Sequence, residues 1–443
     1  MQLILKNFRA VQEARVDLAP VTLVYGPNGT GKSTLLYAPV VLRNIVMNPA
    51  QGIPAFFNLR AVNLGGLTEV VFDHDASREL ELGISYQSGQ CAVGYRVALW
   101  GETSGRFTLS LRYVPQWPQP SSPHRKRTID AVKALEESKP SGILGSPVDV
   151  TLELEVSFPY PANSRSETRF DVEGGTALLV WNGIAVVEQD FPPRFEVEAR
   201  DFIEAANSPL ERLRKTTFVP LIRGFFKPLY SRVPVTGTPL GEEEVASWIE
   251  ADRYFDSRIS SFLERIAGRQ FVVRGLSGTG LFSLITRDAR TALGVDLVNE
   301  GFGVNQLVYL LAKSLHRDSE LICIEEPEIH LHPGAIRRLA RVIGEIALQE
   351  GKTFLISTHS EALVTAFLAE VAAGRMKPVD LACYASLRQG KAVRFERRAV
   401  NERGQVEGGL ESFMEGEEEV TKALLGAAYE ASDDSGAGRV GHP

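Results

Sequence analysis

The sequence of 443 residues is poor in cysteine and has no long apolar stretch. Its three cysteines lie far apart in apolar or strand-like surroundings, which excludes a disulfide framework or a zinc cluster and fits reduced thiols. The longest apolar stretches, such as Leu35–Val46, are short and contain Arg43, whereas a membrane span needs roughly 18 apolar residues. Residues 1–10 show no signal-peptide pattern. We therefore expect a cytoplasmic protein without a membrane segment.

The sequence also lacks an excess of basic residues and any regular repeat. It has 48 Lys and Arg against 55 Asp and Glu, a net charge of −7, which excludes a surface that is basic all over but allows a local basic groove. Proline and glycine interrupt the middle of the chain, so no heptad run is long enough for a coiled coil. The apolar fraction of 44% is that of an ordinary soluble protein, here of about two to three domains.

A phosphate-binding loop is present at residues 26–33, Gly-Pro-Asn-Gly-Thr-Gly-Lys-Ser, which fit the pattern G-x-x-x-x-G-K-[ST] in full. The loop follows an apolar strand at 21–25 and opens a predicted helix at 31–47, the context that this pattern requires. Its backbone N–H groups can wrap phosphates, helped by the positive end of the helix. Lys32 is expected to reach the β and γ phosphates, and the hydroxyl of Ser33 to hold Mg²⁺. Alone, the loop predicts ATP or GTP binding by Gly26, Pro27, Asn28, Gly29, Thr30, Gly31, Lys32, Ser33 and Thr34.

Two carboxylates follow a second apolar strand at 321–324. In a parallel sheet, the carboxyl end of such a strand faces the ligand crevice. Glu325 therefore suits the Mg²⁺ shell, and Glu326 suits orienting or deprotonating a water molecule. A solvated acidic strand end is the simpler alternative, which the loop upstream makes less favoured.

Histidines in the last third allow two interpretations. The segment Glu328–Pro333 contains two histidines and a glutamate, but its spacing does not match H-E-x-x-H, so a loop that reaches a partner subunit is favoured over a zinc site. His359 follows another apolar strand, at 353–357. Because that strand is expected beside the one ending at Glu325, His359 can face the γ-phosphate as a hydrogen-bond donor.

A second glycine-rich turn occurs at 299–306, where a helix is predicted to begin. Two glycines at a helix start can form another anion site. It cannot hold the ATP that the first loop already binds, so we expect Gly301, Gly303, Asn305 and Gln306 to meet the ATP of a second copy of the chain. A buried packing turn is the alternative.

The order of these segments resembles that of ABC-type ATPases of the SMC/RecF group, and most of all the ATPase domain of OLD-type (overcoming lysogenization defect) proteins and their stand-alone relatives. The resemblance covers residues 1–90 and about 270–425. It rests on residues 26–33, on Gly301-Phe-Gly303, on Ile324-Glu-Glu-Pro-Glu-Ile-His-Leu-His-Pro333, on Ser357-Thr-His-Ser360 and on Gly408–Phe413.

This resemblance implies an α/β fold: a two-lobed P-loop NTPase head with a RecA-like core, an antiparallel β lobe and a mixed β and helical insertion, without a long coiled coil. We expect residues 1–90 to form the N-terminal half of the head, with the phosphate loop and the β lobe. Residues 91–270 would be the insertion, 271–400 the C-terminal half, and 401–443 a C-terminal segment with a flexible tail.

The resemblance also implies roles for single residues and an ATP-dependent homodimer with two sandwiched ATP molecules. By motif match, Glu325 holds the metal in a role that Asp usually fills, Glu326 is the catalytic carboxylate and His359 is the switch histidine. Residues 330–333 match the D-loop, and residues 301–306 the signature segment.

Three departures from the family pattern stand out. Asn305 occupies a place where Ser is common, and Gln51 is only a weak candidate for the Q-loop glutamine. OLD-type proteins carry a C-terminal Toprim nuclease, but only 84 residues follow His359, and they contain no matching acidic motif. A nuclease domain is therefore not expected within this sequence.

Three functions remain open. The first is a dimeric ATP switch that acts on DNA in repair, recombination or defence against mobile elements. The second is an ATPase that powers or gates a separate effector such as a nuclease. The third, a transporter motor, is least favoured, because about 210 residues separate the first lobe from the signature segment, which lacks the sequence L-S-G-G-Q.

Two minor motifs have simpler interpretations. His124–Arg127 and Trp117 could contact a nucleic-acid backbone and base, but a solvated loop is favoured. Asp73–Asp75 could bind metal, but its place between two predicted strands favours a hairpin turn.

The pattern of apolar residues predicts further elements. It favours antiparallel strands from Thr68 to Trp100, a strand at 148–158 and a hairpin at 176–187. Helices are expected at 128–138, 208–215, 242–268, 301–314 and 333–348.

Overall fold

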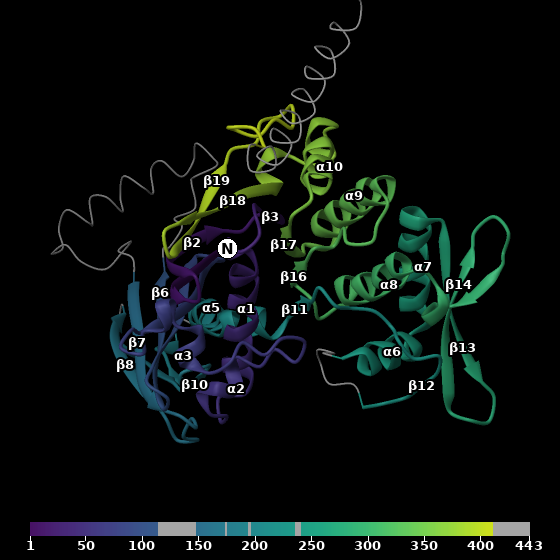
Figure 1. The fold of residues 1–443 in the computed structure, drawn as a ribbon. Helices are drawn as coiled ribbons and strands as arrows, with labels where there is room; N and C mark the ends of the chain where they lie inside the picture. Colours follow the sequence, from purple (N-terminus) through teal and green to yellow (C-terminus); the bar gives the residue numbers. More distant parts are fainter. Residues whose placement is uncertain (114–147, 173–174, 194–195, 235–240, 411–443) are drawn as a thin grey trace, which may run out of the picture.

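The computed structural model describes residues 1–113, 148–172, 175–193, 196–234 and 241–410. It shows an α/β fold in which a central, mostly parallel sheet has an antiparallel β lobe on one side and a layer of helices on the other (Figure 1). The motifs at His124–Arg127 and Trp117, the predicted helix at 128–138, and the tail beyond residue 410 lie outside the described residues.

The central sheet has the strand order β11-β16-β17-β3-β18-β19. The first five strands are parallel, and β19 pairs antiparallel to β18. Their bounds are β3 (Val21–Tyr25), β11 (Thr216–Val219), β16 (Leu321–Glu325), β17 (Thr353–Thr358), β18 (Leu381–Gln389) and β19 (Ala392–Arg398). The predicted strands that precede the phosphate loop, Glu325 and His359 are thus neighbours, and their carboxyl ends meet at one edge.

Both faces of the sheet are buried at its central strands β16, β17 and β3, which explains why these strands are almost continuously apolar. Side chains alternate between two cores: Val24 and Leu355 pack on the side of the β lobe, whereas Leu23 and Ile356 pack on the side of the helices.

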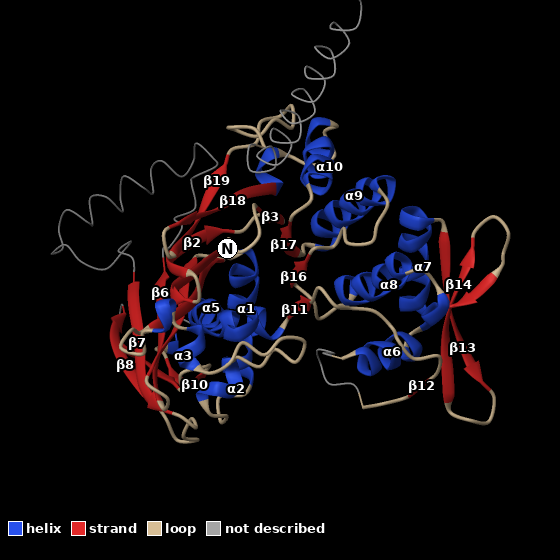
Figure 2. Cartoon of the chain, viewed as in Figure 1, coloured by secondary structure: helices blue, strands red, loops and turns tan. Residues whose placement is uncertain are grey.

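The β lobe consists of a six-stranded antiparallel sheet and a three-stranded sheet beside it (Figure 2). The larger sheet has the order β2-β1-β4-β5-β6-β7, with β1 (Gln2–Phe8), β2 (Val11–Asp17), β4 (Leu80–Ser88), β5 (Cys91–Trp100), β6 (Ser104–Tyr113) and β7 (Val148–Ser157). The smaller one comprises β8 (Ser166–Val172), β9 (Gly175–Trp181) and β10 (Val186–Asp190). Two helices, α1 (Lys32–Met47) and α5 (Glu196–Arg214), pack against the larger sheet.

The opposite side of the central sheet carries the helices α6 (Glu242–Ala251), α7 (Arg253–Ala267), α8 (Phe302–Leu315), α9 (Pro333–Glu350) and α10 (Glu361–Ala372). An antiparallel pair, β13 (Arg269–Leu276) and β14 (Leu281–Asp288), projects beyond α7 and α8, with the short strands β12 (Tyr230–Ser231) and β15 (Gly294–Asp296) beside β14 (Figure 1). None of the helices in the described residues is long and apolar enough to cross a bilayer.

Several predicted elements agree with the structure. The strand at 148–158, the hairpin at 176–187 and the helices at 301–314 and 333–348 are confirmed as β7, the β9–β10 pair, α8 and α9. The helix predicted at 208–215 is the end of the longer α5.

Two local predictions were wrong. Residues 67–74 are not a strand but a short helix, α3 (Leu67–Val70), and a 3₁₀ turn, η1 (Phe72–His74), because the backbone N–H of Gly66 donates to the side chain of Glu69 and starts a helix. The single helix predicted at 242–268 is two helices. Asp252 separates them, since its carboxylate accepts from the backbone of Tyr254 and Phe255 and caps α7.

The segment 91–270 is divided between both lobes. Its first strand, β5, pairs with β4 across the turn at 89–90, so the boundary after residue 90 falls inside one hairpin. Its strand β11 joins the central sheet next to β16. Strands β5–β7 and β11 therefore extend the two sheets, β8–β10 form a sheet of their own, and β11 is followed by a loop at the edge where the motifs meet.

Candidate nucleotide-binding site

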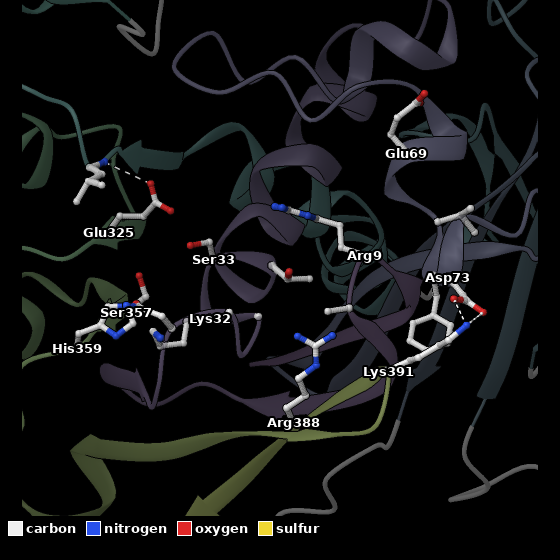
Figure 3. A pocket seen from close by; sticks show the side chains of 18 of the residues that line it. Arg9, Lys32, Ser33, Glu69, Asp73, Glu325, Ser357, His359, Arg388 and Lys391 are labelled. Atoms are coloured by element: carbon white, nitrogen blue, oxygen red, sulfur yellow. Dashed lines mark hydrogen bonds and ion pairs between the residues drawn. The ribbon is translucent and has the colours of Figure 1, made fainter. Parts of the chain in front are cut away.

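A cavity of about 660 Å³ lies at the carboxyl edge of the central sheet, where it meets the β lobe (Figure 3). It unites the sequence motifs, which contribute Asn28, Gly29, Gly31, Lys32, Ser33, Thr34, Glu325, Glu326, Ser357 and His359 to its lining. Residues more than 300 positions apart in the sequence therefore share one polar cavity, as expected from the parallel order of β16, β17 and β3.

The phosphate loop has the backbone that such a loop needs. Gly26 has φ 144°, and a Cβ there would lie 2.6 Å from the carbonyl oxygen of Ser386 in β18, so only glycine fits. Thr30 does not line the cavity, because its hydroxyl donates to the carbonyl of Pro27 at 2.8 Å. Gly26, Pro27 and Thr30 therefore shape the loop, and the other predicted residues face the cavity.

Lys32 is held over the loop rather than in open solvent. Its Nζ donates to the carbonyl oxygens of Gly26 at 2.8 Å and Pro27 at 2.7 Å. Burial lowers the pKa of Lys32 to about 8, partly offset by the charge of Glu326. The ammonium is thus placed at the first turn of α1, where phosphate oxygens would exchange for the carbonyl oxygens.

Glu325 lies at the end of β16 and is buried, with both carboxylate oxygens bound. The hydroxyl of Tyr37 donates to Oε1 at 2.8 Å, and the backbone N–H of Leu221 donates to Oε2 at 3.3 Å. The hydroxyl of Ser33 hydrogen bonds to the same phenol, and the pKa of Tyr37 is raised by burial and by Glu325. Tyr37 therefore joins the two predicted metal ligands.

The residues present fit Mg²⁺. Ser33 and Glu325 supply a hydroxyl and a carboxylate, the hard oxygen ligands that this ion takes together with phosphates and water. No cluster of three His, Cys, Asp or Glu side chains suited to a metal occurs in the described residues. The site thus suits an ion held jointly with a nucleotide.

Glu326 and His359 form a pair at the same edge. His359 Nε2 lies 3.1 Å from Glu326 Oε1, and the imidazole also hydrogen bonds to the backbone of Gly26. Burial and the nearby charge of Lys32 lower the pKa of His359, while Glu326 opposes them. The pair therefore connects the end of β16 with the start of the phosphate loop.

Arg223, which was not predicted from the sequence, binds the backbone at Glu325 and Glu326. It is buried and donates to the backbone carbonyls of Glu325 at 2.7 Å and Glu326 at 2.9 Å. Burial lowers the pKa of Arg223 to about 10. Glu326 has φ 41°, a sparsely populated conformation for a residue other than glycine, which persists only where its surroundings enforce it. Arg223 supplies that enforcement.

Glu328 is a buried residue beneath the site rather than a metal ligand. Its Oε1 accepts from the hydroxyl of Thr358 at 2.5 Å, and burial raises the pKa of Glu328 to about 7. Nearby, His332 Nδ1 accepts from the backbone N–H of Gly334 at 3.2 Å and caps α9, whereas His330 is exposed. The segment 328–333 thus divides into buried support, an exposed loop and a helix cap.

The signature segment lies apart from the cavity of its own chain. Gly301 caps α8, and a Cβ there would have no neighbour within 4 Å, whereas a Cβ on Gly303 would lie 2.5 Å from the carbonyl oxygen of His330. Gly301 is therefore open to a partner, and Gly303 permits α8 to pack against the loop at His330. Phe302, between them, is 63% exposed.

Asn305 and Gln306 do not have the exposed placement expected for phosphate contacts. Asn305 is buried; its Oδ1 accepts from Phe225 N at 2.7 Å, and its Nδ2 donates to the carbonyls of Phe225 and Leu297. Gln306 is also buried. In this structure the amide of Asn305 ties the loop after β11 to the start of α8.

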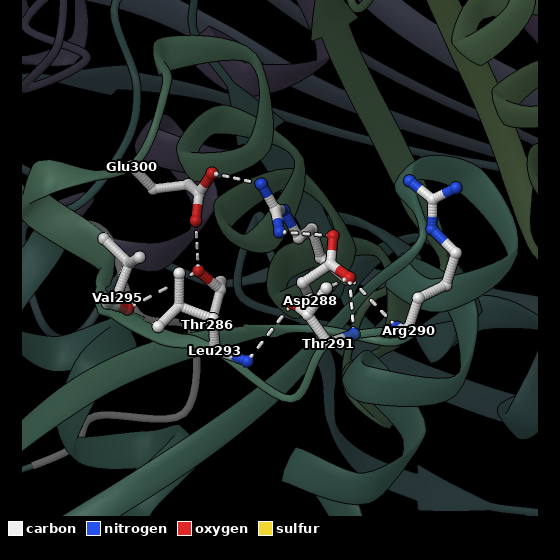
Figure 4. Close-up of polar contacts among 8 residues, drawn as sticks. Thr286, Asp288, Arg290, Thr291, Leu293, Val295 and Glu300 are labelled. Carbon is white, nitrogen blue, oxygen red and sulfur yellow. Dashed lines mark hydrogen bonds and ion pairs between the residues drawn. The ribbon is translucent and has the colours of Figure 1, made fainter.

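A polar network fixes the segment that enters α8 (Figure 4). Glu300 accepts from the hydroxyl of Thr286 at 2.5 Å and lies 3.4 Å from Arg269, which also pairs with Asp288 at 2.9 Å. Asp288 in turn accepts from the backbone N–H groups of Arg290 and Thr291. The signature segment is thereby attached to β14.

The residues at the far end of the cavity were not predicted from the sequence. This end is lined by side chains from the β1–β2 turn, α3, η1 and the β18–β19 hairpin: Arg9, Glu69, Asp73, His74, Arg388 and Lys391 (Figure 3). Lys391 pairs with Asp73 at 2.7 Å, and the guanidinium of Arg9 lies 5.3 Å from the ring centre of Tyr37. Asp73–Asp75, interpreted as a hairpin turn, is a 3₁₀ turn at this end. Gln51, the weak candidate for the Q-loop glutamine, does not line this cavity. The residue beside Glu325 is Leu221, in the loop after β11.

Comparison with known families supports an AAA-type ATPase. Residues 192–365 match a family described as "AAA domain, putative AbiEii toxin, Type IV TA system", and residues 2–40 match a second AAA domain family. Each match covers less than half of the chain. The two segments include the phosphate loop, the strands β16 and β17, and the residues Glu325, Glu326 and His359. No curated protein matches the chain.

Solved structures of SMC head domains are similar over most of the chain at low identity. The SMC head domain from Thermotoga maritima has 12% identity and a TM-score of 0.38, covering 89% of this chain and 97% of its own. The Smc head with a coiled coil and joint from Pyrococcus yayanosii has 10% identity and a TM-score of 0.45, with 95% and 99% covered. The Pyrococcus furiosus Smc head bound to the C-terminal domain of ScpA has 9% identity and a TM-score of 0.39, with 95% and 98% covered.

Proposed function

We propose that this chain binds ATP with Mg²⁺, hydrolyses it, and works as a homodimer that holds two ATP molecules between its copies. The observation that carries the proposal is the joining, in one cavity, of Lys32, Ser33, Glu325, Glu326 and His359. Each of these groups has a part in phosphoryl transfer to water, in which positioning and electrostatics contribute most of the catalysis.

The side chains divide the work as follows. Lys32 and the loop N–H groups bind the phosphates, and Ser33 and Glu325 hold Mg²⁺, which when bound neutralises charge on the phosphate oxygens. Glu326 accepts a proton from the attacking water, and the N–H of His359 keeps Glu326 oriented. Arg223 holds the backbone of both glutamates in place.

The dimer is supported by the surface beside the cavity. The loop after β11 carries exposed apolar side chains, of which Ile222 is 82% and Phe226 is 49% exposed. Asn305 fastens this loop to α8, where Phe302 is also exposed. Apolar groups next to a polar cavity, with Gly301 open, are suited to contact with a second copy of the chain.

The dimer is tested with Glu326→Gln, which keeps the shape of the side chain but removes its basicity. With ATP and Mg²⁺ this variant is expected to double its mass in light scattering, and with ADP it stays a monomer. Adding Lys32→Ala or Ile222→Asp to the variant should abolish the dimer. Tight ATP binding by Glu326→Gln without a change in mass would overturn the dimer and leave ATP binding intact.

We infer that the protein uses ATP hydrolysis to act on DNA, in repair, recombination or defence against mobile elements. The support is the order of motifs shared with the SMC/RecF group. The test is the ATPase rate with single-stranded, double-stranded and branched DNA, with Lys32→Ala as the control for contaminating ATPases. Stimulation by at least one form supports this function.

If no form of DNA changes the rate, the second candidate is favoured: an ATPase that powers or gates a separate effector such as a nuclease. The observation for it is the matched family, whose description names a toxin of a type IV toxin–antitoxin system. Co-purification of one effector protein with Glu326→Gln in the presence of ATP, and its loss with Lys32→Ala, would support it. A transporter role is the least favoured, and co-fractionation with a membrane permease would be its test.

A further inference from the structure

A second cavity, of about 280 Å³, lies behind α1 and shares no lining residue with the nucleotide cavity. Its walls come from three places in the fold: Arg43 and Asn44 of α1, the turn around Arg60, and β11 with Lys313 of α8. No carboxylate belongs to the lining among the residues that the structure describes. The cavity therefore presents cations and amides without acidic groups.

Two of these cations are almost fully buried. Lys313 is 2% exposed, and its Nζ donates to the carbonyl of Phe218 at 2.9 Å, whereas an ammonium can donate three hydrogen bonds. Arg43 is 8% exposed, and its Nε makes a long contact of 3.4 Å with the carbonyl of Arg214. The third cation, Arg60, is more exposed and lies 3.3 Å from Glu244.

Buried charges are normally paired, because removing an ion from water costs several kcal/mol unless an opposite charge compensates. Burial lowers the pKa of Lys313 to about 7, Arg43 lowers it further, and only Glu244 opposes. Burial also lowers the pKa of Arg43. Because the described lining holds no carboxylate, a bound anion would offset the cost of burying both cations.

We propose that this cavity binds a phosphate group, with Lys313 and Arg43 as its two counter-charges. A phosphate dianion balances two cations, and the planar guanidinium of arginine matches phosphate oxygens in two parallel hydrogen bonds. Asn44 also lines the cavity, but its Nδ2 already donates to the carbonyls of Phe56 at 3.2 Å and Asn58 at 3.1 Å, so the two cations carry the phosphate contacts in this cavity. Its volume has room for an organic part beyond the phosphate, so the ligand is free phosphate or a small phosphate monoester.

The site is connected to the nucleotide cavity through two elements. Arg43 lies about three turns after Lys32 on the same helix, α1. Lys313 holds the carbonyl of Phe218 in β11, and three residues later the backbone of Leu221 contacts Glu325. Binding that draws Lys313 away from Phe218 therefore acts on the segment that orients Glu325.

The test measures phosphate binding by calorimetry in a Lys32→Ala background, so that the phosphate loop contributes little signal and the result does not depend on ATP hydrolysis. One phosphate per chain is expected. Adding Lys313→Met or Arg43→Gln should weaken binding at least tenfold, whereas Arg317→Gln, which removes an exposed cation elsewhere, should leave it unchanged. Ribose 5-phosphate forms the second arm: tighter binding than phosphate identifies a monoester as the ligand, and weaker binding identifies free phosphate.

Stability supplies an independent measurement. Without phosphate, Lys313→Met should melt no lower than its parent, because a buried charge is removed; phosphate should raise the melting temperature of the parent only. Absence of binding of both ligands, or binding that neither variant weakens, would overturn the proposal. If Lys313→Met does not fold, Arg43→Gln decides the outcome by the same criteria.

Discussion

His359 Nε2 lies 3.1 Å from Glu326 Oε1, so that the residues directly after two neighbouring strands contact each other. Because β16 and β17 are parallel and in register, with Glu325 opposite Ser357, the pair is fixed by the central sheet. A hydrolytic water placed by Glu326 would therefore be linked to the phosphate loop through His359 and Gly26.

The contact between His359 and Glu326 predicts that ATPase activity falls at acid pH, which we call the acid limb of the pH profile. The pKa of His359 lies below its ordinary value, so the ring is neutral at pH 7 and takes up a proton only below about pH 6.5. Protonation strengthens its attraction for Glu326 and withdraws that carboxylate from the water. The rate should decline as the pH falls below 6.5 from its value at pH 7, and His359→Gln should remove this decline.

Glu326→Gln serves as the reference for that profile. A general base contributes roughly 10²–10⁴-fold, so the variant should lose about that much in kcat while it still binds ATP. A rate that rises as the pH falls, or an acid limb that persists in His359→Gln, would contradict the assignment of this pair.

Replacing Gly301 or Gly303 by alanine is predicted to have different effects: the first on the dimer, the second on the stability of the fold. Gly303→Ala forces a Cβ to within 2.5 Å of the carbonyl of His330 and should destabilise the fold by about 1–3 kcal/mol. Gly301→Ala meets no atom within 4 Å, and the weaker capping of α8 by alanine should cost less than about 1 kcal/mol. Gly301→Ala should, however, weaken the ATP-dependent dimer of the Glu326→Gln protein.

Urea unfolding and light scattering separate the two effects. The proposal that Gly301 contacts a second copy of the chain would be wrong if Gly301→Ala left the dissociation constant of the ATP-dependent dimer unchanged. Equal loss of stability in both variants would instead contradict the different surroundings of the two glycines.

Asn305 is expected to act on stability. Replacing it by alanine leaves the N–H of Phe225 and two carbonyls without their buried partners, which should cost about 2–3 kcal/mol. Asn299→Ala, which truncates an exposed amide just before the same helix, is the matched control and should cost less than about 0.5 kcal/mol. A direct phosphate contact by Asn305 would show the reverse pattern, with normal urea unfolding and a lost dimer.

The sequence predicted the motif-bearing half of the site because each motif is local. Each motif can be recognised within about eight residues: the phosphate loop, the apolar strand with carboxylates and the strand with a histidine. Parallel pairing of their strands brings the three motifs to one edge of the sheet. The far end of the cavity has no such pattern. Asp73 and Lys391 are 318 positions apart, and nothing local in either segment indicates the other.

Side chains with a polar group and several possible partners were the hardest to predict. Asn305 fits both a phosphate contact and a buried bridge, and only the position of Phe225, 80 residues earlier, decides between them. Arg223 reaches Glu325 over 102 residues. Such contacts depend on which loop the fold places beside which strand, information that periodicity does not contain.

His316, a buried ring directly after α8, should contribute to the pH dependence of stability in the acid range. The backbone N–H of Asp318 donates to its Nδ1 at 3.1 Å, which requires that nitrogen to be unprotonated. Burial, helped by Arg317 and Lys352, lowers the pKa of His316 to about 3. Asp318 Oδ2, at 3.9 Å from Nε2, is too distant to compensate.

Since the folded pKa lies below the ordinary value of about 6.5, the unfolded chain binds the proton first as the pH falls. The contribution of His316 is therefore complete above about pH 6.5 and declines towards pH 3, by on the order of 3 kcal/mol. Glu328 acts in the opposite sense: with its pKa raised to about 7, it lowers stability as the pH rises through the interval from about 4.5 to 7.

Urea unfolding at each pH, compared between the parent and His316→Leu, removes the part due to Glu328 because both proteins share it. The difference in unfolding free energy should be constant above pH 6.5 and shift in favour of His316→Leu as the pH falls. His332→Asn, which keeps the cap of α9 but removes an exposed ring, should follow the parent throughout. Parallel curves for the parent and His316→Leu would mean that the protonated ring is accommodated where it lies.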